Sequence, residues 1–580
     1  MFKGRKWIVI AATCLLAFMS ACSGGTGNNQ NTGTAAPSVS PSAAPSESAA
    51  PSAEPETFDP FGRYPETVEF TTIKATVNNP QFPEGQSYED NDFNRFMQEQ
   101  LNVKPVYQWM QPRDGFAYKQ KLDLSIAGND IPDVFQILGS SVQEVQATLK
   151  RLVDADMVED LTSVFEQYAS PAIQENYASE NNRILDLFKI DGKIYGIPEQ
   201  TALDGFNFVW IREDWRKQLG LPEPKTMDDI IAIAAAFKAK DPYGGGKTVP
   251  VAMQMESETN GLFGPGFLFD QYEAFPRMFY KDASGELKYG GIEPQTKEAL
   301  KVLSRMYGEG LLERDFAMKD TGQLQEVLAS GRAGIVGQAW WAVWYPLFMT
   351  LQNVPDADWK PYVITGANGK INYGATAPTR SMIVVKKGFK HPELPIKWLN
   401  VYQENKDTEQ FIKLEQEVFK ESNDKRPIWL GMSVERTDGI VLQANDIVKA
   451  VDGAIDPSTL LFKNQDAFKH IQAFLGDLQN EPQAASKNML QWQNTRSWYD
   501  AMGGASVYEV NLTYSAYDGR TPAMEKYLTA LDALQMKVYH TIIMKSKPEE
   551  IDAEFDKFVS DWKAQGGDEI LAEVAQEINN

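Results

Sequence analysis

Aromatic side chains crowd one short stretch of the chain. Trp340, Trp341, Trp344 and Tyr345 lie within residues 338–345, directly after a strand predicted at 333–336. Large aromatic faces suit the apolar faces of sugar rings, and ligands of open α/β sheets bind beyond the carboxyl ends of strands. The pattern predicts a sugar-stacking site with Trp340 and Trp341 as its platforms. The alternative, that Trp341 and Trp344 pack in a core at helical spacing, stays open.

Thiol, imidazole and metal chemistry have few candidates in this chain. Its two cysteines are Cys14 and Cys22, and its three histidines, His391, His470 and His540, lie far apart in sequence. No HExxH pair is present, and a Ser-His-Asp or His-ligated metal site has little to draw on. We therefore expect no metal site, no cofactor and no catalytic residue.

Two other motifs could do chemistry and are weak. Residues 244–248 read Gly-Gly-Gly-Lys-Thr, but a phosphate loop needs glycine at 241, where Asp241 stands, and it should follow a strand rather than a helix. Glu199 and Asp204 could form the carboxylate pair of a glycosidase. With 79 acidic residues in the chain, spacing does not separate this pair from chance.

Alternating strands and helices must position these residues. Strands are predicted at 68–74, 103–109, 206–211, 333–336 and 381–385, and residues 130–138 are predicted to form a turn and a short buried strand. Helices are predicted at 93–101, 114–127, from Thr226 onward, at 296–307, at 324–328 and over the last 60 residues. Thr226 with Asp229 forms a capping-box signal. Such alternation favours a mostly parallel sheet with helices on both faces.

Composition narrows the classes of partner. The chain is 43% hydrophobic and 11% aromatic, which is typical of a globular protein with a full core. Its formal net charge is −23, which becomes −23 − 3 = −26 without the basic residues Lys3, Arg5 and Lys6. So acidic a surface repels phosphate backbones, and nucleic acid is excluded as a partner.

The first 57 residues resemble a targeting signal followed by a spacer. Residues 1–21 combine a basic start and a short apolar run, and Met19-Ser-Ala-Cys22 resembles the lipobox of bacterial lipoproteins. We expect 1–21 to be a signal peptide and Cys22 to carry lipid. Residues 22–57 are rich in Ser, Ala and Pro, which predicts a disordered tether. An ordinary secretory signal with an incidental cysteine is the alternative.

The order of several segments resembles the family 1 extracellular solute-binding lipoproteins of ABC importers, which are similar in layout to maltose-binding protein. The segments are 118–135, Asp191-Gly-Lys-Ile-Tyr-Gly-Ile-Pro198, Trp210-Ile-Arg-Glu-Asp-Trp215, Leu328-Ala-Ser-Gly-Arg-Ala-Gly-Ile and Trp562-Lys-Ala-Gln-Gly-Gly-Asp-Glu-Ile. The chain departs from the family at Asp241-Pro-Tyr-Gly, where members often carry a carboxylate-rich loop suited to calcium. It also has Ala202 near the position of an acidic sugar-binding residue, so maltose specificity is not implied.

The resemblance implies a two-lobed type II periplasmic-binding-protein fold of the α/β class, with hinge strands between lobes whose sheets are mixed and mostly parallel. We place lobe I at 58–200 and 375–445 and lobe II at 201–374 and 446–580. Ligand binding is expected at Trp340 and Trp341, and from position alone at Trp109, Asn78, Gln200 and Arg380.

The implied function is capture of a small solute, an oligosaccharide in the first instance, by closure of two lobes, with delivery to an ABC permease in the membrane. We expect a monomer held by lipid on the outer face of the cell membrane of a bacterium, in the first instance a Gram-positive one. Two alternatives stay open: a membrane-tethered glycosidase or lyase that uses a carboxylate such as Glu199, and a peptide-binding surface lipoprotein.

Overall fold

A computed structural model describes residues 58–113, 117–203, 205–255, 263–377, 379–419, 429–478, 480–481 and 483–579. The predicted signal, tether and lipidation site at Cys22 lie outside these residues, as does Asp204. Contacts group Phe58–Asn580 into one unit. No helix of the described residues is both long and apolar enough to cross a membrane.

Five clusters of buried apolar side chains divide the elements of this unit into two sets. Two clusters draw on residues 64–197 and 382–434. Three draw on residues 206–371 and 444–574. We call the elements around the first two clusters lobe I and the others lobe II. Each lobe therefore combines stretches that are far apart in the sequence.

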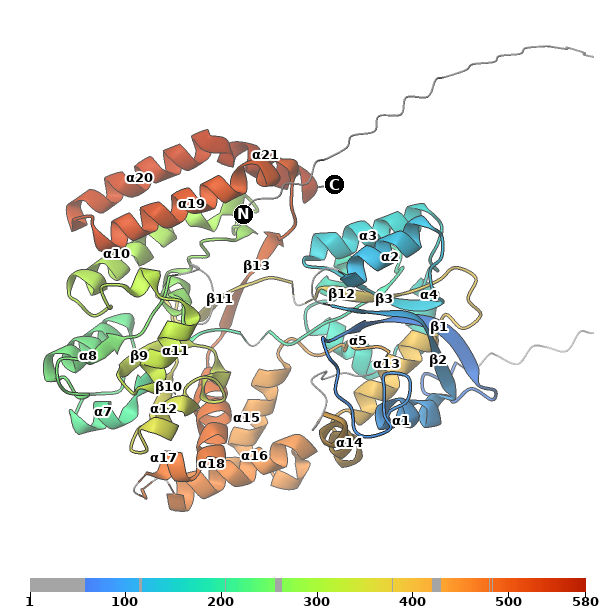
Figure 1. The fold of residues 1–580 in the computed structure, drawn as a ribbon, viewed down its shortest axis with the longest axis horizontal. Coiled ribbons are helices and arrows are strands. Elements are labelled where there is room, and N and C mark those ends of the chain that lie inside the picture. The colour runs from blue at the N-terminus through green and yellow to red at the C-terminus, as the bar shows by residue number, and fades with distance from the viewer. Residues whose placement is uncertain are drawn as a thin grey trace, which may run out of the picture. The chain divides into compact units, whose positions relative to one another are not determined.

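Lobe I is built on two small sheets, β1-β2 and β3-β12-β4. Its strands are β1 Val68–Thr76, β2 Val103–Pro112, β3 Val134–Leu138, β4 Ile197–Pro198 and β12 Ser381–Val385. Its helices are α1 Asp92–Leu101, α2 Ala117–Ala127, α3 Val142–Asp154, α4 Thr162–Tyr168, α5 Pro171–Ala178, α6 Arg183–Leu187, α13 Leu394–Asn405 and α14 Glu409–Phe419. Figure 1 shows β12, from the second half of the chain, beside β3.

Lobe II has a sheet in the order β10-β5-β9-β6 and a second in the order β11-β13-β7-β8. Its strands are β5 Phe208–Arg212, β6 Val249–Val251, β7 Phe279–Lys281, β8 Leu287–Tyr289, β9 Ala333–Gln338, β10 Trp359–Tyr362, β11 Ile371–Ala375 and β13 Val510–Tyr517. The strands β11 and β13 pair in parallel over five residues and run together in Figure 1.

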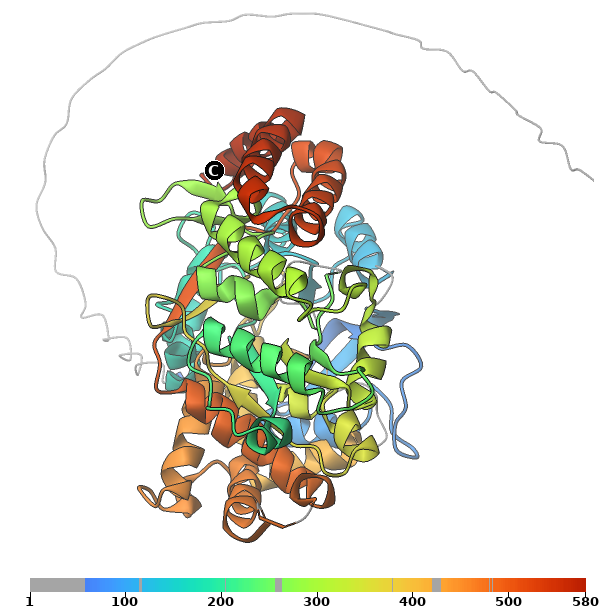
Figure 2. The same cartoon turned by 90° about the vertical axis from the view of Figure 1, so that its left-hand side faces the viewer.

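Helices make up most of lobe II. They are α7 Glu213–Gln218, α8 Met227–Lys240, α9 Gly266–Phe269, α10 Pro294–Gly308, α11 Thr321–Ala329, α12 Phe348–Asn353, α15 Gly439–Val451, α16 Phe462–Ala473, α17 Ala484–Lys487, α18 Met489–Asn494, α19 Pro522–Met544, α20 Ile551–Trp562 and α21 Asp568–Glu577, with a 3-10 turn η5 Trp340–Val343 and a π-helical stretch η8 Thr495–Gly503. Figure 2 shows the C-terminal helices beside α10.

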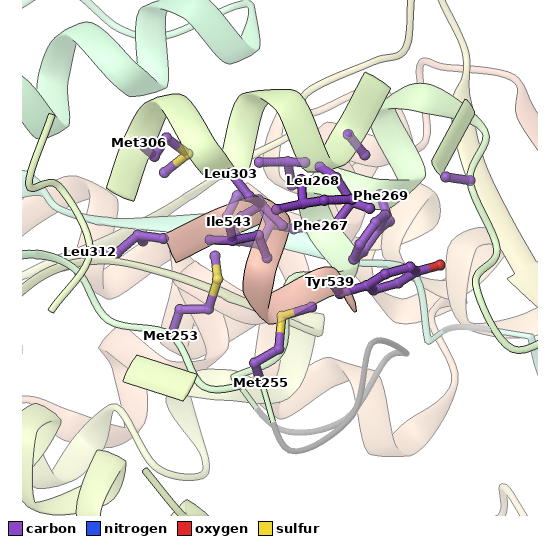
Figure 3. Close-up of a cluster of buried hydrophobic side chains, with 14 of the residues drawn as sticks. Met253, Met255, Phe267, Leu268, Phe269, Leu303, Met306, Leu312, Tyr539 and Ile543 are labelled. Carbon is purple, nitrogen blue, oxygen red and sulfur yellow. The ribbon is translucent and has the colours of Figure 1, made fainter. Parts of the chain in front are cut away.

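The largest cluster of lobe II explains how the C-terminal helices are held. Met253, Phe267 and Leu303 from the middle of the chain pack with Tyr539 and Ile543 of α19, and all five are buried (Figure 3). The C-terminal helices therefore contribute to the core of lobe II.

Local signals explain several boundaries. The capping box predicted at Thr226 is present, because Thr226 Oγ1 accepts from the amide of Asp229 and the Asp229 carboxylate accepts from the amide of Thr226. Gly566, with φ of 116°, separates α20 from α21.

The sheets are mixed, as predicted, but the prediction that they are mostly parallel is wrong. Both kinds of pairing occur, but β12 runs antiparallel to β3 and β4, and β5 runs antiparallel to β9 and β10. Among the strands described, antiparallel pairs outnumber parallel ones. The physical reason is the chain path: β12 enters lobe I after the whole of 205–377, and it inserts between two strands that run the other way.

Candidate functional site

In the sheet β3-β12-β4 of lobe I, the ends of β3 and β4 lie beside the start of β12. Because β12 is antiparallel to both neighbours, its first residue, Ser381, pairs with Leu138 at the end of β3, and Met382 pairs with Pro198 at the end of β4. The residues just beyond these strand ends therefore gather at the same place.

A cavity of about 340 Å³ opens at this edge. We call it the strand-end pocket. Its lining residues come from the end of β2, from α2, from the β3–α3 turn and from the residues beside β4 and β12: Arg113, Tyr118, Lys119, Leu138, Gly139, Ser140, Glu144, Glu199, Arg380 and Ser381. It brings the predicted residue Arg380 together with Glu199, the carboxylate of the enzyme alternative.

Glycine is required at one point of the wall. A Cβ added to Gly139 would lie 2.7 Å from Val145 Cγ2 and 2.9 Å from the carbonyl oxygen of Ser141. The amide of Gly139 donates to the carbonyl of Arg380 at 3.0 Å. The turn between β3 and α3 therefore sits tightly against the segment that carries Arg380.

The two carboxylates of the pocket already have hydrogen-bond partners. Ser381 Oγ donates to Glu199 Oε2 at 2.8 Å, and Gln136 Nε2 donates to Ser381 Oγ at 3.1 Å. Glu144 Oε2 accepts from the amide and the hydroxyl of Ser140, both at 2.7 Å. Although burial raises the pKa of Glu144, these hydrogen bonds and the nearby ammonium of Lys119 lower it on balance.

The two arginines of the pocket form no ion pair among the described residues. Within the part of the chain that the structure describes, neither Arg113 nor Arg380 has a carboxylate oxygen within 4.0 Å of its guanidinium. Asp518, just after β13, is the carboxylate that Arg380 influences: burial raises the pKa of Asp518, and the charge of Arg380 opposes this rise. Asp518 Oδ2 is buried without a hydrogen-bond partner.

Two aromatic rings back the pocket. Tyr118 of α2 donates its hydroxyl to the carbonyl of Gln136 at 2.5 Å. Trp109 of β2 meets Tyr118 edge to face, with ring centroids 5.2 Å apart, and its indole nitrogen is buried without a hydrogen-bond partner. Trp109 thus stands behind the lining residue Tyr118, and ligand contact at Trp109 remains a prediction.

The predicted platforms lie elsewhere, in lobe II. Trp340 and Trp341 open η5, directly after β9, and neither lines the strand-end pocket. Both are half-buried, whereas Trp344 is 38% exposed. Trp340 packs on Trp498 of η8 with centroids 4.9 Å apart. Trp340 is therefore supported by Trp498, and both Trp340 and Trp341 are partly open to solvent. Sugar contact at these two rings is still a prediction.

A buried ion-pair network fixes the support under Trp340. Arg496 of η8 donates to Asp358 Oδ2 at 2.7 Å and to Asp500 Oδ2 at 2.6 Å. Trp492 donates its indole nitrogen to Asp358 Oδ1 at 2.8 Å. Asp358 directly precedes β10, so the network joins the helical segment that carries Trp498 to the sheet of lobe II.

The two remaining predicted residues differ from each other. Asn78 is exposed, two residues beyond the end of β1. Gln200 is fully buried, and its amide donates to the carbonyls of Asn176 at 2.6 Å and Glu435 at 2.8 Å. These bonds give Gln200 a structural role where the chain leaves lobe I, and ligand contact at either residue is untested.

The lobes also touch through β13. Tyr514 donates its hydroxyl to Glu180, and the guanidinium of Arg183 lies 3.6 Å from the centroid of the Tyr514 ring. The amide of Asp518 donates to Gln143 Oε1 of α3 at 3.3 Å. These contacts were not predicted from the sequence. The alternation of apolar and polar residues in Val510-Asn-Leu-Thr-Tyr-Ser-Ala is a strand signal, but it does not report which elements the strand touches.

A second cavity, of about 660 Å³, lies in lobe II, and Asp518 is among its lining residues. Asp270 lines it in a buried position, where Asn207 Nδ2 donates to its carboxyl at 2.9 Å. Burial raises the pKa of Asp270 to about 7, against the opposing effect of this hydrogen bond.

The loop at 241–248 is closed on itself. Asp241 accepts from the amide of Gly246 at 2.6 Å and from the hydroxyl of Thr248 at 2.6 Å, and these bonds lower its pKa. The carboxylate therefore serves its own loop. Among the residues described, no three His, Cys, Asp or Glu side chains are grouped to hold a metal ion.

Comparison with known proteins places the chain in a family. Residues 79–409 match the model of the bacterial extracellular solute-binding proteins, and the chain belongs to this family. The structure resembles a solved extracellular solute-binding protein from Bifidobacterium longum subsp. infantis (TM-score 0.55, 16% identity, 89% of this chain and 99% of that one). It also resembles the alginate-binding protein AlgQ2 (TM-score 0.50, 16% identity, 89% and 99%). The fold is that of the type II solute-binding proteins, as predicted.

Curated relatives match over part of their length. Lipoprotein LipO of Bacillus subtilis is 24% identical over 46% of this chain and 49% of its own. The polygalacturonan/rhamnogalacturonan-binding protein YtcQ of B. subtilis is 24% identical over 37% and 41%. The fructooligosaccharide ABC transporter substrate-binding protein FusA of Streptococcus pneumoniae is 28% identical over 36% and 39%. The chain thus spans half or less of these three relatives.

Proposed function

We propose that this chain is the substrate-binding component of an ABC importer, and that it captures an oligosaccharide between lobes I and II for delivery to a membrane permease. The family match and the type II fold support solute binding. The observation that favours a sugar is the aromatic segment of η5, where Trp340 and Trp341 are half-buried and Trp340 rests on Trp498.

The lobes of the proposal are 58–200 with 375–445 and 201–374 with 446–580. The division of the apolar clusters supports these boundaries except the one at 445, because Ala444 of α15 packs in a cluster of lobe II. Each lobe would offer part of the site: the strand-end pocket on lobe I and the η5 tryptophans on lobe II. A ligand that contacts both lobes favours the arrangement in which both contacts are made, and this arrangement is what a permease can recognise.

The proposal includes a lipid anchor at Cys22, a signal peptide at 1–21, a monomeric state and a place on the outer face of the cell membrane of a Gram-positive bacterium. The lipobox-like sequence before Cys22 supports the anchor. The relative LipO is named a lipoprotein. Labelling of cells with radioactive palmitate tests this part: wild type takes up label, and Cys22→Ser does not.

A tethered glycosidase or lyase is the second candidate, and Glu199 in the strand-end pocket is the observation that favours it. The matched family consists of binding proteins rather than enzymes. We propose that Glu199 is a binding and positioning group, since it is held by Ser381. Incubation of the protein with oligosaccharides should give no products, and hydrolysis that is lost in Glu199→Gln would establish the enzyme instead.

A thermal-shift screen against oligosaccharides and oligopeptides tests the proposed function. A ligand at 100 times its dissociation constant stabilises the folded state by about 2.7 kcal/mol. At about 2.1 cal/mol/K of unfolding entropy per residue, roughly 520 residues in the unit give about 1.1 kcal/mol/K, and thus a rise in Tm of about 2–3 °C. A shift with peptides but with no sugar would contradict the proposal.

A further inference from the structure

The strand-end pocket carries more positive than negative charge, in a chain whose formal net charge is −23. Arg113, Lys119 and Arg380 line it together with two carboxylates, Glu144 and Glu199. The lining side chains therefore have a formal charge of 3 − 2 = +1. A local excess of cations on so acidic a protein favours an anionic ligand group at this place.

Three of these five charged side chains already have partners within the protein. Lys119 is paired, with Asp123 at 2.7 Å and with Glu144 at 3.5 Å. The carboxylates of Glu144 and Glu199 accept hydrogen bonds from Ser140 and Ser381. The two guanidinium groups are thus the charged groups of the lining without an ion-pair partner. Both arginines are exposed and have no carboxylate within ion-pair distance among the described residues.

Asp518 does not neutralise Arg380. Its oxygens lie more than 4.0 Å from the guanidinium, as the pair forms no salt bridge in the described structure. Burial also raises the pKa of Asp518, and the charge of Arg380 opposes this rise. Arg380 therefore keeps donors free for a ligand.

The backbone adds to the field of the arginines. Gly139 and Ser140 of the lining lead into α3, whose N-cap is Ser141. The N-terminal end of a helix carries a partial positive charge. Guanidinium groups bind planar carboxylates through two parallel hydrogen bonds, which makes a carboxylate the anion that fits two arginines best.

The rest of the wall suits a sugar. Tyr118 lines the pocket with Trp109 behind it, and a volume of about 340 Å³ lies within the range of about 300–1,000 Å³ that is usual for small-ligand sites. An aromatic wall beside two arginines offers one surface to a sugar ring and another to its carboxylate.

We propose that the strand-end pocket binds the carboxylate of an acidic oligosaccharide, one that contains uronic acid units, with Arg380 and Arg113 as the anion ligands. This inference rests on the proposed function, because it names the substrate class of the same protein. It makes the arginines the residues that select a charged sugar over its neutral counterpart.

Titration calorimetry of the purified full chain tests the proposal with a matched pair of ligands, trigalacturonate and its fully methyl-esterified form. The two differ in charge at the carboxyl groups and share the sugar rings. The acid should bind at least about tenfold more tightly than the ester, because a hydrogen bond to a charged group is worth about ten- to hundredfold in affinity. The preference should shrink as salt is raised.

Two variants and a control locate the effect. Arg380→Gln should weaken binding of the acid about ten- to hundredfold and leave binding of the ester unchanged, and Arg113→Gln should act in the same direction. Arg314→Gln is the control, since Arg314 lies over Tyr307 of lobe II and does not line the pocket. Unchanged unfolding midpoints in all three would show that the side chains act on the ligand.

The outcomes separate this inference from the proposed function. Equal binding of acid and ester, or acid binding that survives both substitutions, would overturn the inference and leave sugar capture standing. Failure of every oligosaccharide, acidic or neutral, would count against the proposed function itself. Arg380-dependent binding of an acidic peptide or of sulfate, with no binding of trigalacturonate, would also overturn the inference, in favour of a general anion site.

Discussion

Replacement of Arg496 by methionine should destabilise lobe II measurably. Arg496 has a side chain that is 10% exposed and is bonded to Asp358 and Asp500. Burial lowers its pKa, but the two carboxylates outweigh this effect and raise it on balance. The arginine is therefore charged in the folded protein, and its loss leaves two shielded carboxylates without their cation.

The size of the effect follows from the geometry. Removal of one partner of a buried ion pair costs about 3–5 kcal/mol. Asp358 retains the hydrogen bond from Trp492, so the lower end, about 3 kcal/mol, is expected. At about 1.1 kcal/mol/K for roughly 520 residues that unfold together, this corresponds to a fall in Tm of about 3 °C.

Urea unfolding of Arg496→Met measures the loss of unfolding free energy, and calorimetry measures the fall in Tm. The matched control is Arg95→Met, because Arg95 is also paired with two carboxylates, those of Asp90 and Asp92, but its side chain is 44% exposed. Exposed pairs contribute about 0–1 kcal/mol. If Arg496→Met cost less than 1 kcal/mol, or no more than the control, the argument from burial would be refuted.

Three further changes have defined outcomes. Burial raises the pKa of Asp270 to about 7, above the unfolded value near 4, so the folded state loses stability as pH rises from about 4 to 7. Asp270→Asn should remove on the order of 4 kcal/mol of this loss. Urea midpoints that change by the same amount between pH 4 and pH 8 in wild type and variant would contradict this prediction. Trp340→Ala should weaken oligosaccharide binding about tenfold or more in calorimetry, while Trp344→Ala, at an exposed ring, should not; equal effects would remove the stacking role. Tyr514→Phe deletes the hydrogen bond to Glu180 and should lower the unfolding free energy by about 1.5–3 kcal/mol, and an unchanged urea midpoint would speak against that contact.

The strands that line or support the strand-end pocket could be read from the sequence. The strand predicted at 381–385 is present as β12 with the same bounds, and the short strand predicted after a turn within 130–138 is present as β3. Both are apolar runs buried on both faces, which is the clearest strand signal a sequence carries. Arg380 directly precedes the second of these runs and lines the strand-end pocket, and ligand contact at Arg380 stays a prediction.

Other parts were hidden for physical reasons. The strand β13 was missed although Val510-Asn-Leu-Thr-Tyr-Ser-Ala alternates apolar and polar residues. What the sequence hides is its partner, because β13 pairs with β11 across more than 130 residues, and its residues are half-buried throughout apart from Tyr517. Arg113, just after β2, and Tyr118 of α2 line a pocket that also takes in Arg380 and Ser381, far along the chain. Tertiary pairing decides such positions, and periodicity within one segment does not report it.

The place of β12 also sets the order in which the protein can fold. This strand lies between β3 and β4 in its sheet, yet it is synthesised almost 200 residues after β4. Until residues 381–385 emerge, β3 and β4 have no strand between them, and the buried faces of Met382 and Ile383 are missing from the core. Contacts of such long range form slowly. A nascent chain of this design stays incompletely folded until two-thirds of it has been made.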